Sequence, residues 1–154
     1  MSTKTFLADL RAIILEQVDR NSSLQRIADL IRSAGNYRWV GLYEVDHVAG
    51  LVKNIVWSGT GAPEYPVFPV TKGLTSAAIS GGKTINVGNV ASDSRYLTAF
   101  GSTKSEIIVP IFDATRKTVI GTIDVESGME NAFDLETQSL LELCSGMIQP
   151  LWAG

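Results

Sequence analysis

The chain has 154 residues, 45% of them hydrophobic and 19% charged, a length that fits one domain with its own hydrophobic core. Thirteen basic and sixteen acidic residues give a net charge of −3, and there is no block of like charge, so we expect binding neither to nucleic acid nor to membranes. No apolar run reaches the roughly 18 residues that cross a bilayer, and the N-terminus lacks a signal-peptide core, which predicts a soluble, cytoplasmic protein.

The first 35 residues predict two helices. Apolar side chains recur there at the three- and four-residue spacing of a helix. Ser22, followed by Gln25 three residues later, resembles the capping box that opens a helix, and Gly35 is typical of a helix end. The two apolar stripes consist of Phe6, Leu7, Leu10, Ile13, Ile14 and Val18, and of Leu24, Ile27, Ala28 and Ile31.

Strand patterns dominate the chain from about residue 37 to residue 127. Two pairs of strand-like segments, each joined by a short turn, predict two antiparallel hairpins. With a last helix capped by Asp134, this order predicts a single α+β domain over residues 1–154, with a central antiparallel sheet rather than a dinucleotide-binding α/β fold. We expect strands at residues 37–45, 51–59, 67–70, 84–87, 105–112 and 118–126, and helices at about 3–34, 73–79 and 134–152.

A stretch of about 15 residues, 89–104, has little helix or strand periodicity and carries Tyr96, Leu97 and Phe100 among small polar residues. Loops of this length in compact domains tend to be functional lids or binding loops. We therefore expect this stretch to cover a binding site.

The sequence holds one cysteine, Cys144, and one histidine, His47. This count excludes an intrachain disulfide, a two-cysteine redox relay and a zinc site built from Cys and His, and we expect no metal and no cofactor. His47 lies between two strand-like runs, in a segment typical of a turn, so we predict an exposed turn histidine. Cys144 lies on the apolar stripe of the last helix, where a free cysteine behaves as a small hydrophobic residue of the core.

The second hairpin has one apolar face, which sets its register. The register that pairs apolar with apolar residues places Ile107 opposite Ile123. It also places Ile111 opposite Val119, and it requires an odd-length turn around Thr115.

The same register gathers three carboxylates on the other face, with Glu106 opposite Asp124 and Glu126 two residues further along. This face is either simply solvated or, since it also carries Ile108, Pro110, Phe112 and Ile120, part of a covered pocket. Carboxylates that cluster in a partly dry cavity repel one another and have raised pKa values unless a cation joins them. An ammonium or guanidinium ligand would relieve this repulsion.

Five short segments carry recognisable motifs: residues 38–43 (RWVGLY), 69–74 (PVTKGL), 105–110 (SEIIVP), 120–127 (IGTIDVES) and 133–134 (FD). Together they resemble the GAF domain, a small-molecule-binding relative of the PAS fold, and within it the free methionine-(R)-sulfoxide reductases. The likeness runs from about residue 5 to residue 151. The resemblance implies a sheet with the N- and C-terminal helices on one face and a ligand pocket on the other, and a homodimer.

The resemblance also implies roles for individual residues. In the family, acidic residues hold the amino group of the substrate, and Glu106, Asp124 and Glu126 match their positions, the last being Glu where the family usually has Asp. Trp39 and Tyr43 match aromatic positions near the ligand, although aromatic residues in strands are also often core residues. The full set of expected ligand-binding residues is Glu106, Asp124, Glu126, Trp39, Tyr43, Tyr65, Thr75, Tyr96 and Phe100.

The catalytic cysteines of the family are missing. By our alignment Tyr65, Thr75 and Ala99 occupy their positions. Sulfoxide reduction by this route needs a thiolate that attacks sulfur and a second thiol that resolves the adduct, and neither a hydroxyl nor a methyl group replaces them.

Three functions therefore stay open. The first is a GAF-type sensor or signalling module that binds a small amine-bearing molecule, such as a free amino-acid derivative, without redox catalysis. The second is a divergent reductase or another chemistry in the same pocket. The third is a dimerisation module with a vestigial pocket, for which Leu140, Leu143, Met147 and Trp152 are candidate contacts.

Overall fold

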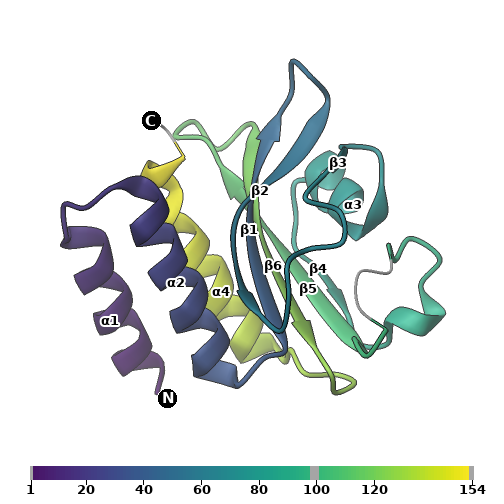
Figure 1. Ribbon diagram of the computed structural model, residues 1–154, viewed down its shortest axis with the longest axis horizontal. Coiled ribbons are helices and arrows are strands. Elements are labelled where there is room, and N and C mark those ends of the chain that lie inside the picture. The colour runs from purple at the N-terminus through teal and green to yellow at the C-terminus, as the bar shows by residue number, and fades with distance from the viewer. Residues whose placement is uncertain (1, 98–100, 153–154) are drawn as a thin grey trace.

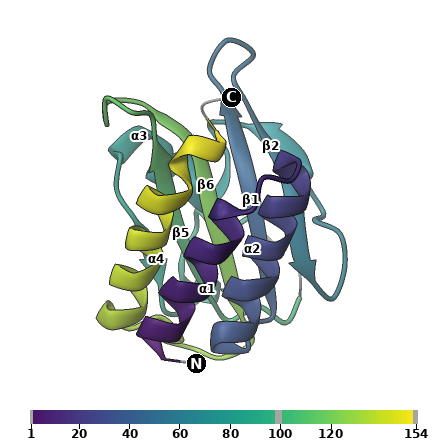
Figure 2. The same cartoon turned by 90° about the vertical axis from the view of Figure 1, so that its left-hand side faces the viewer.

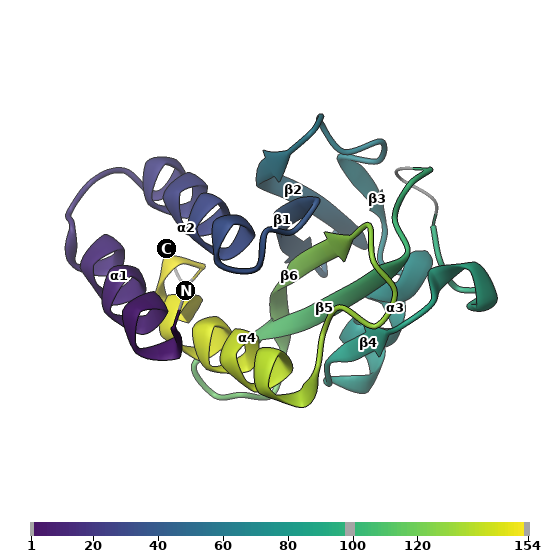
Figure 3. The same ribbon diagram turned by 90° about the horizontal axis from the view of Figure 1, so that it is seen from below.

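The computed structural model describes residues 2–97 and 101–152, and within them six strands form one antiparallel sheet in the order β3-β2-β1-β6-β5-β4. Helices α1 (Thr3–Leu15), α2 (Arg20–Gly35) and α4 (Leu135–Ile148) cover one face of this sheet (Figures 1 and 2). Helix α3 (Gly73–Gly81) and the loops around it lie on the other side (Figures 1 and 3). The α+β prediction is confirmed. The strands are β1 (Trp39–Asp46), β2 (Leu51–Gly59), β3 (Val67–Pro69), β4 (Ile85–Val87), β5 (Ser105–Phe112) and β6 (Val119–Ser127), and the short 3-10 helices are η1 (Val90–Ser92) and η2 (Gln149–Leu151).

The boundaries of the first two helices differ from the sequence-based expectation. The cap of α2 is Asp19, whose carboxylate accepts the backbone N–H of Ser22 at 3.0 Å, so the predicted cap at Ser22 was wrong. A carboxylate at this position satisfies an N–H that the helix itself leaves unpaired. At the other end Gly35 is still helical, and Asn36 takes the left-handed conformation (φ 51°) that ends the helix. Val18, predicted in the first stripe, lies beyond the end of α1 and is exposed.

The register of the β5–β6 hairpin differs from the predicted one by two residues. Glu106 pairs with Glu126 rather than with Asp124, and Ile107 pairs with Val125. The turn has six residues, 113–118, so the predicted odd-length turn was wrong. The register shifts by one residue between Ile111 and Phe112, so Val119 pairs with Phe112 rather than with Ile111 as predicted. The turn closes on Asp113, whose side chain accepts the backbone N–H of Lys117 and whose own N–H donates to the carbonyl of Thr118. Because side chains alternate with a period of two, the two-residue shift leaves Glu106, Asp124 and Glu126 on their predicted face. Ile120, which the sequence predicted on the same face, lies beside the bulge and packs against the main core instead.

The main hydrophobic core lies between the sheet and the three helices. Ile107, Val109 and Ile111 of β5 pack there with Ile123 and Val125 of β6. Their neighbours from the other elements include Phe6, Leu10, Leu24, Ile27, Val40, Leu42, Leu141, Cys144 and Ile148.

The single cysteine and the single histidine lie where the sequence predicted. Cys144 is fully buried, and burial raises the pKa of its thiol to about 12. His47 is exposed in the β1–β2 turn, with its Nε2 atom 2.7 Å from the carbonyl oxygen of Val119. Among the described residues no helix is both long and apolar enough to span a membrane.

Candidate functional site

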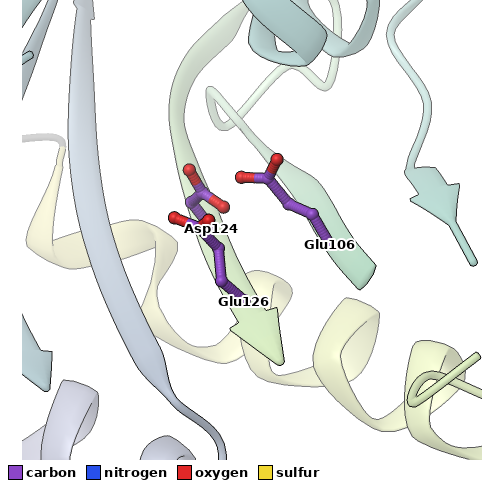
Figure 4. Close-up of side chains that lie close together, drawn as sticks. All are labelled: Glu106, Asp124 and Glu126. Atoms are coloured by element: carbon purple, nitrogen blue, oxygen red, sulfur yellow. The ribbon is translucent and has the colours of Figure 1, made fainter. Parts of the chain in front are cut away.

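Three carboxylates converge on the sheet face opposite the helices. Glu106 on β5 and Glu126 on β6 are directly paired, and Asp124 lies two residues before Glu126 on the same strand. Figure 4 shows the three carboxyl groups turned toward one another. Their oxygen atoms lie within 4.8 Å of one another, close enough for one small cation to contact all three. The residues are nonetheless buried, with exposed fractions of 5% for Glu106, 8% for Asp124 and 2% for Glu126.

Burial and mutual repulsion favour the protonated forms of these groups. Burial, and then the charge of Asp124, raises the pKa of Glu106 well above its usual range. Burial raises the pKa of Asp124 to about 6, and burial together with the charge of Asp124 raises the pKa of Glu126 to about 8. Burial, and then the charge of Asp124, also raises the pKa of the Tyr43 hydroxyl well above its usual range. The three acids therefore cannot all carry a charge at neutral pH without a cation among them.

One oxygen of the cluster has no partner. Asp124 Oδ1 is buried and accepts no hydrogen bond from the described residues. By contrast, Glu126 Oε1 lies 3.5 Å from the hydroxyl of Tyr96, which donates to it. Buried polar atoms are almost always paired with protein, water or a ligand, because leaving one unpaired costs about 1–3 kcal/mol. The free Asp124 oxygen is thus a position at which a donor from outside the protein would be stabilised.

Aromatic rings form the wall beside the acids. The ring centroids of Trp39 and Tyr43 are 6.4 Å apart, and those of Tyr43 and Phe68 are 5.8 Å apart. Gly41 lies between Trp39 and Tyr43 in the sequence and pairs with Asp124 of β6. Its missing side chain allows the two rings to pack here, since a Cβ at this position would lie 2.3 Å from the Trp39 ring. The indole N–H of Trp39 donates to the carbonyl of Gly61 at 3.0 Å and so fixes the loop after β2.

Acids, rings and the start of α3 enclose a small cavity of about 40 Å³. A water molecule needs roughly 10–15 Å³ of such volume, so the cavity holds only a few. Lys72, which precedes α3, makes no capping side-chain bond in the described chain, and residues 73–75 of the first turn border the cavity. The complete lining is Trp39, Tyr43, Pro63, Tyr65, Phe68, Gly73, Leu74, Thr75, Leu97, Glu106, Ile108, Asp124 and Glu126.

Comparison with known proteins identifies the family. The model of the GAF domain matches residues 19–149 of this chain. The chain belongs to the GAF domain family. Domains of this family commonly bind small molecules or act as sensor modules.

Several relatives resemble this GAF domain over most of its length. The type II free methionine-R-sulfoxide reductase from Thermoplasma acidophilum is 29% identical, with a TM-score of 0.81 over 86% of this chain and 92% of that one. The free methionine-R-sulfoxide reductase from Neisseria meningitidis, solved in complex with its substrate, has a TM-score of 0.89 at 22% identity, over 98% of this chain and 88% of that one. GAF domain-containing protein A of Dictyostelium discoideum is 24% identical over 136 residues, 85% of this chain and 80% of that protein. The predicted resemblance to GAF domains and to these reductases is confirmed.

The structure brings most of the predicted site residues to one cavity, while their role in binding stays a prediction. Tyr96 reaches the cluster through its hydroxyl group, and Phe100 and Ala99 lie outside the described residues. Trp39 is both a buried packing residue and part of the cavity wall, so the two interpretations of it are not exclusive. The predicted residues that line the cavity are Trp39, Tyr43, Tyr65, Thr75, Glu106, Asp124 and Glu126.

Six lining residues were not among the expected ligand-binding residues: Pro63, Phe68, Gly73, Leu74, Leu97 and Ile108. Phe68 belongs to a strand of three residues, too short for a pattern of alternation to identify its face. Leu74 lies in the motif at residues 69–74, but on sequence alone it is indistinguishable from an ordinary buried residue of a short helix. Only its position directly after Gly73 in that motif could have drawn attention to it.

Proposed function

We propose that this GAF domain binds a small molecule with a primary ammonium group, such as a free amino acid or its derivative, without redox catalysis. The observation that carries the proposal is the cluster of three buried carboxylates with the unpaired oxygen of Asp124. A primary ammonium has three N–H donors, one for each carboxylate, and its charge offsets the mutual repulsion of the acids.

The remaining walls suit the rest of an amino acid. The aromatic side chains Trp39, Tyr43 and Phe68 offer an apolar surface to a side chain of the ligand. The uncapped start of α3 presents backbone N–H groups of the kind that bind a carboxylate. A free amino acid exceeds the present volume, so its entry requires the loop residues Pro63, Tyr65 and Leu97 to move outward.

The proposal excludes thiol chemistry because the sequence offers no suitable thiol. Cys144 is the one cysteine of the chain, its thiol is fully buried, and burial raises its pKa to about 12. It also packs in the core on the helix face, whereas the carboxylates lie on the other face of the sheet. At the family's cysteine positions, Tyr65 and Thr75 border the cavity with hydroxyl groups, which cannot form the thiolate that the reduction requires.

Isothermal titration calorimetry tests the proposal with the free amino acids and the two sulfoxides of methionine. We expect binding of an amino acid and no binding of its N-acetyl form, which lacks the ammonium. Glu106→Gln and Asp124→Asn should each weaken binding by about 1.5–3 kcal/mol, as for hydrogen bonds to charged groups. The matched controls Glu136→Gln and Asp9→Asn change exposed carboxylates away from the cavity and should leave affinity unchanged.

Two results of these titrations would contradict the proposal. One is an intact fold that binds none of the amino acids. The other is binding of calcium chloride with no binding of any amine, which would assign the cluster to an inorganic cation instead.

The similarity to the Thermoplasma acidophilum enzyme favours reduction of free methionine sulfoxide as the second candidate. An assay that couples thioredoxin to NADPH oxidation distinguishes it from the first. We expect no turnover of the sulfoxide above background. Any turnover would overturn the non-redox part of the proposal, and Cys144→Ala would then show whether that thiol carries it.

We also propose that the protein forms a homodimer, with the exposed edge of α4 as the contact. Leu143 is 51% exposed there, whereas Leu140, Met147 and Trp152 are partly buried against the core. Light scattering measures the oligomeric state, and Leu143→Glu should shift a dimer toward monomer. A protein that is monomeric at every concentration would contradict this contact.

A further inference from the structure

The carboxylate cluster is too crowded to hold three charges by itself. All three groups lie within 4.8 Å and are at least nine-tenths buried, and repulsion between carboxylates at this distance keeps protons on some of them. Glu106 and Asp124 are, in addition, close enough to share a hydrogen bond, which requires a proton between them. In the ligand-free cluster, at least one of the three carboxyl groups is therefore protonated at neutral pH.

The groups that face the cluster supply little compensating charge. Arg38, directly before β1, lowers the pKa of Glu126, but this effect is smaller than the opposing effects of burial and of Asp124. The other polar groups near the cluster, among the described residues, are hydroxyl groups. They belong to Tyr43 on β1, Tyr96 in the long loop, Tyr65 in the loop before β3, Thr75 on α3 and Thr103 before β5.

The remaining elements contribute uncharged side chains to the cavity wall. These are residues 73–75 of α3, Phe68 of β3, and the loop residues Pro63 and Leu97. Among the described residues, the guanidinium of Arg38 is thus the one cation that acts on the cluster, through Glu126, and the ammonium of a ligand would be a second.

We infer that the ammonium of the ligand displaces protons from the cluster, so that binding releases protons to the solvent and weakens as the pH falls. The inference rests on the proposed function. In the step itself the O–H bond of a protonated Glu106 or Glu126 breaks, the proton passes to water or buffer, and the electron pair stays on the carboxylate. That carboxylate then accepts an N–H of the ammonium, which keeps its own protons.

The pH window follows from the individual groups. With a pKa of about 6 for Asp124 and about 8 for Glu126, and with the pKa of Glu106 also raised well above its usual range, the ligand-free cluster holds at least one proton at pH 7. Each proton released on binding raises the association constant about tenfold per pH unit. We expect affinity to rise about tenfold between pH 6.5 and pH 7.5, and to level off at higher pH, where the carboxylates that accept the ammonium are already ionised.

Calorimetry with L-methionine as the probe measures the released protons. Titrations at pH 7 in phosphate and in Tris, which differ in their heat of ionisation, should give different apparent heats that correspond to about one proton released. Glu126→Gln removes one titrating group and should abolish most of this release and flatten the pH dependence. The control Glu136→Gln, an exposed acid on α4, should leave the release and the affinity unchanged.

The outcomes separate the inference from the proposed function. Binding with equal heats in both buffers and no change of affinity from pH 6.5 to 8 overturns the inference and leaves the proposed function in place. No binding of L-methionine, or of any other amino acid at any pH from 6 to 9, overturns both.

A ligand-free measurement tests the same inference without any variant. Carbon-13 NMR of the side-chain carboxyls should show at least one of the three acids protonated at pH 7. Three ionised carboxylates in the ligand-free protein would overturn the inference.

Discussion

The two faces of the β5–β6 hairpin have opposite roles in this protein. On the helix face, Ile107 and Ile123 pack into the main hydrophobic core. On the pocket face, residues next to them in sequence carry three buried acids and an oxygen without a partner. One face therefore stabilises the fold, whereas the other buries acidic groups whose ionisation opposes folding. Such a cost is typical of residues kept for a functional site.

The largest expected effect is on the helix face. Ile123→Ala removes fully buried methyl and methylene groups and should lower the free energy of unfolding by about 2–5 kcal/mol, because the core cannot close around the cavity. Urea denaturation measures the loss. Affinity for an amino-acid ligand should persist in the folded fraction, and a variant that loses binding but keeps its stability would break the comparison.

On the pocket face, by contrast, we expect a substitution that raises the free energy of unfolding. The pKa of Glu126 is about 8 in the folded protein against an ordinary 4.5, so between these pH values the folded state holds more protons than the unfolded state. The free energy of unfolding should therefore fall as the pH rises from about 4.5 to about 8. Glu126→Gln removes this cost and should be more stable than the wild type at pH 8 by on the order of 3 kcal/mol, because each pH unit between the two pKa values contributes at most about 1.4 kcal/mol.

Denaturation at pH 5 and pH 8 measures this second effect. The gain should be much smaller at pH 5, where Glu126 of the wild type is already protonated. Glu136→Gln, on the exposed surface, serves as the control. Equal stability of wild type and Glu126→Gln at both pH values would show that ionisation of buried Glu126 does not destabilise the folded protein.

A third, intermediate effect concerns the aromatic wall. In Gly41→Ala the new Cβ would lie 2.3 Å from the Trp39 ring and 2.8 Å from the Tyr43 ring, so both rings must shift. We expect a loss of about 1–3 kcal/mol, the range for overpacking, together with weaker ligand binding. Gly146→Ala on α4 is the matched control, because its Cβ would meet nothing within 4 Å.

The smallest expected effect lies on neither face. His47 is exposed in the β1–β2 turn, so His47→Ala should change the free energy of unfolding by no more than about 0.5 kcal/mol and leave binding unaltered. A large loss of affinity in this variant would place functional chemistry outside the pocket.

Alternation along β5 and β6 was sufficient to place Glu106, Asp124 and Glu126 on one face, and therefore to predict that they gather. It misplaced Ile120, which packs against the main core. Alternation could not predict which residues are opposite, because the bulge at Ile111 and the turn closed by Asp113 depend on hydrogen bonds that leave no pattern of hydrophobicity. The sequence pattern also could not decide whether Asp19 or Ser22 caps α2, because both residue types are common caps.

The remainder of the cavity depends on contacts between segments distant in the chain. The ring of Phe68 meets Tyr43 only because β3 pairs with the first residues of β2, beside β1. Such long-range packing is decided by the whole fold, and the local sequence of residues 67–69 contains no trace of it. The motif resemblance predicted that Trp39, Tyr43 and Thr75 lie at the pocket, and all three line the cavity, which periodicity alone could not predict.

The burial of Cys144 makes this protein, in practice, free of reactive thiols. Maleimide and related reagents require an accessible thiolate, which this side chain does not provide. A cysteine introduced at the exposed Ser94, in the loop beside the pocket, would be the one site that such reagents modify. A single fluorophore or spin label there could follow the opening of that loop in real time, with the native sequence otherwise intact.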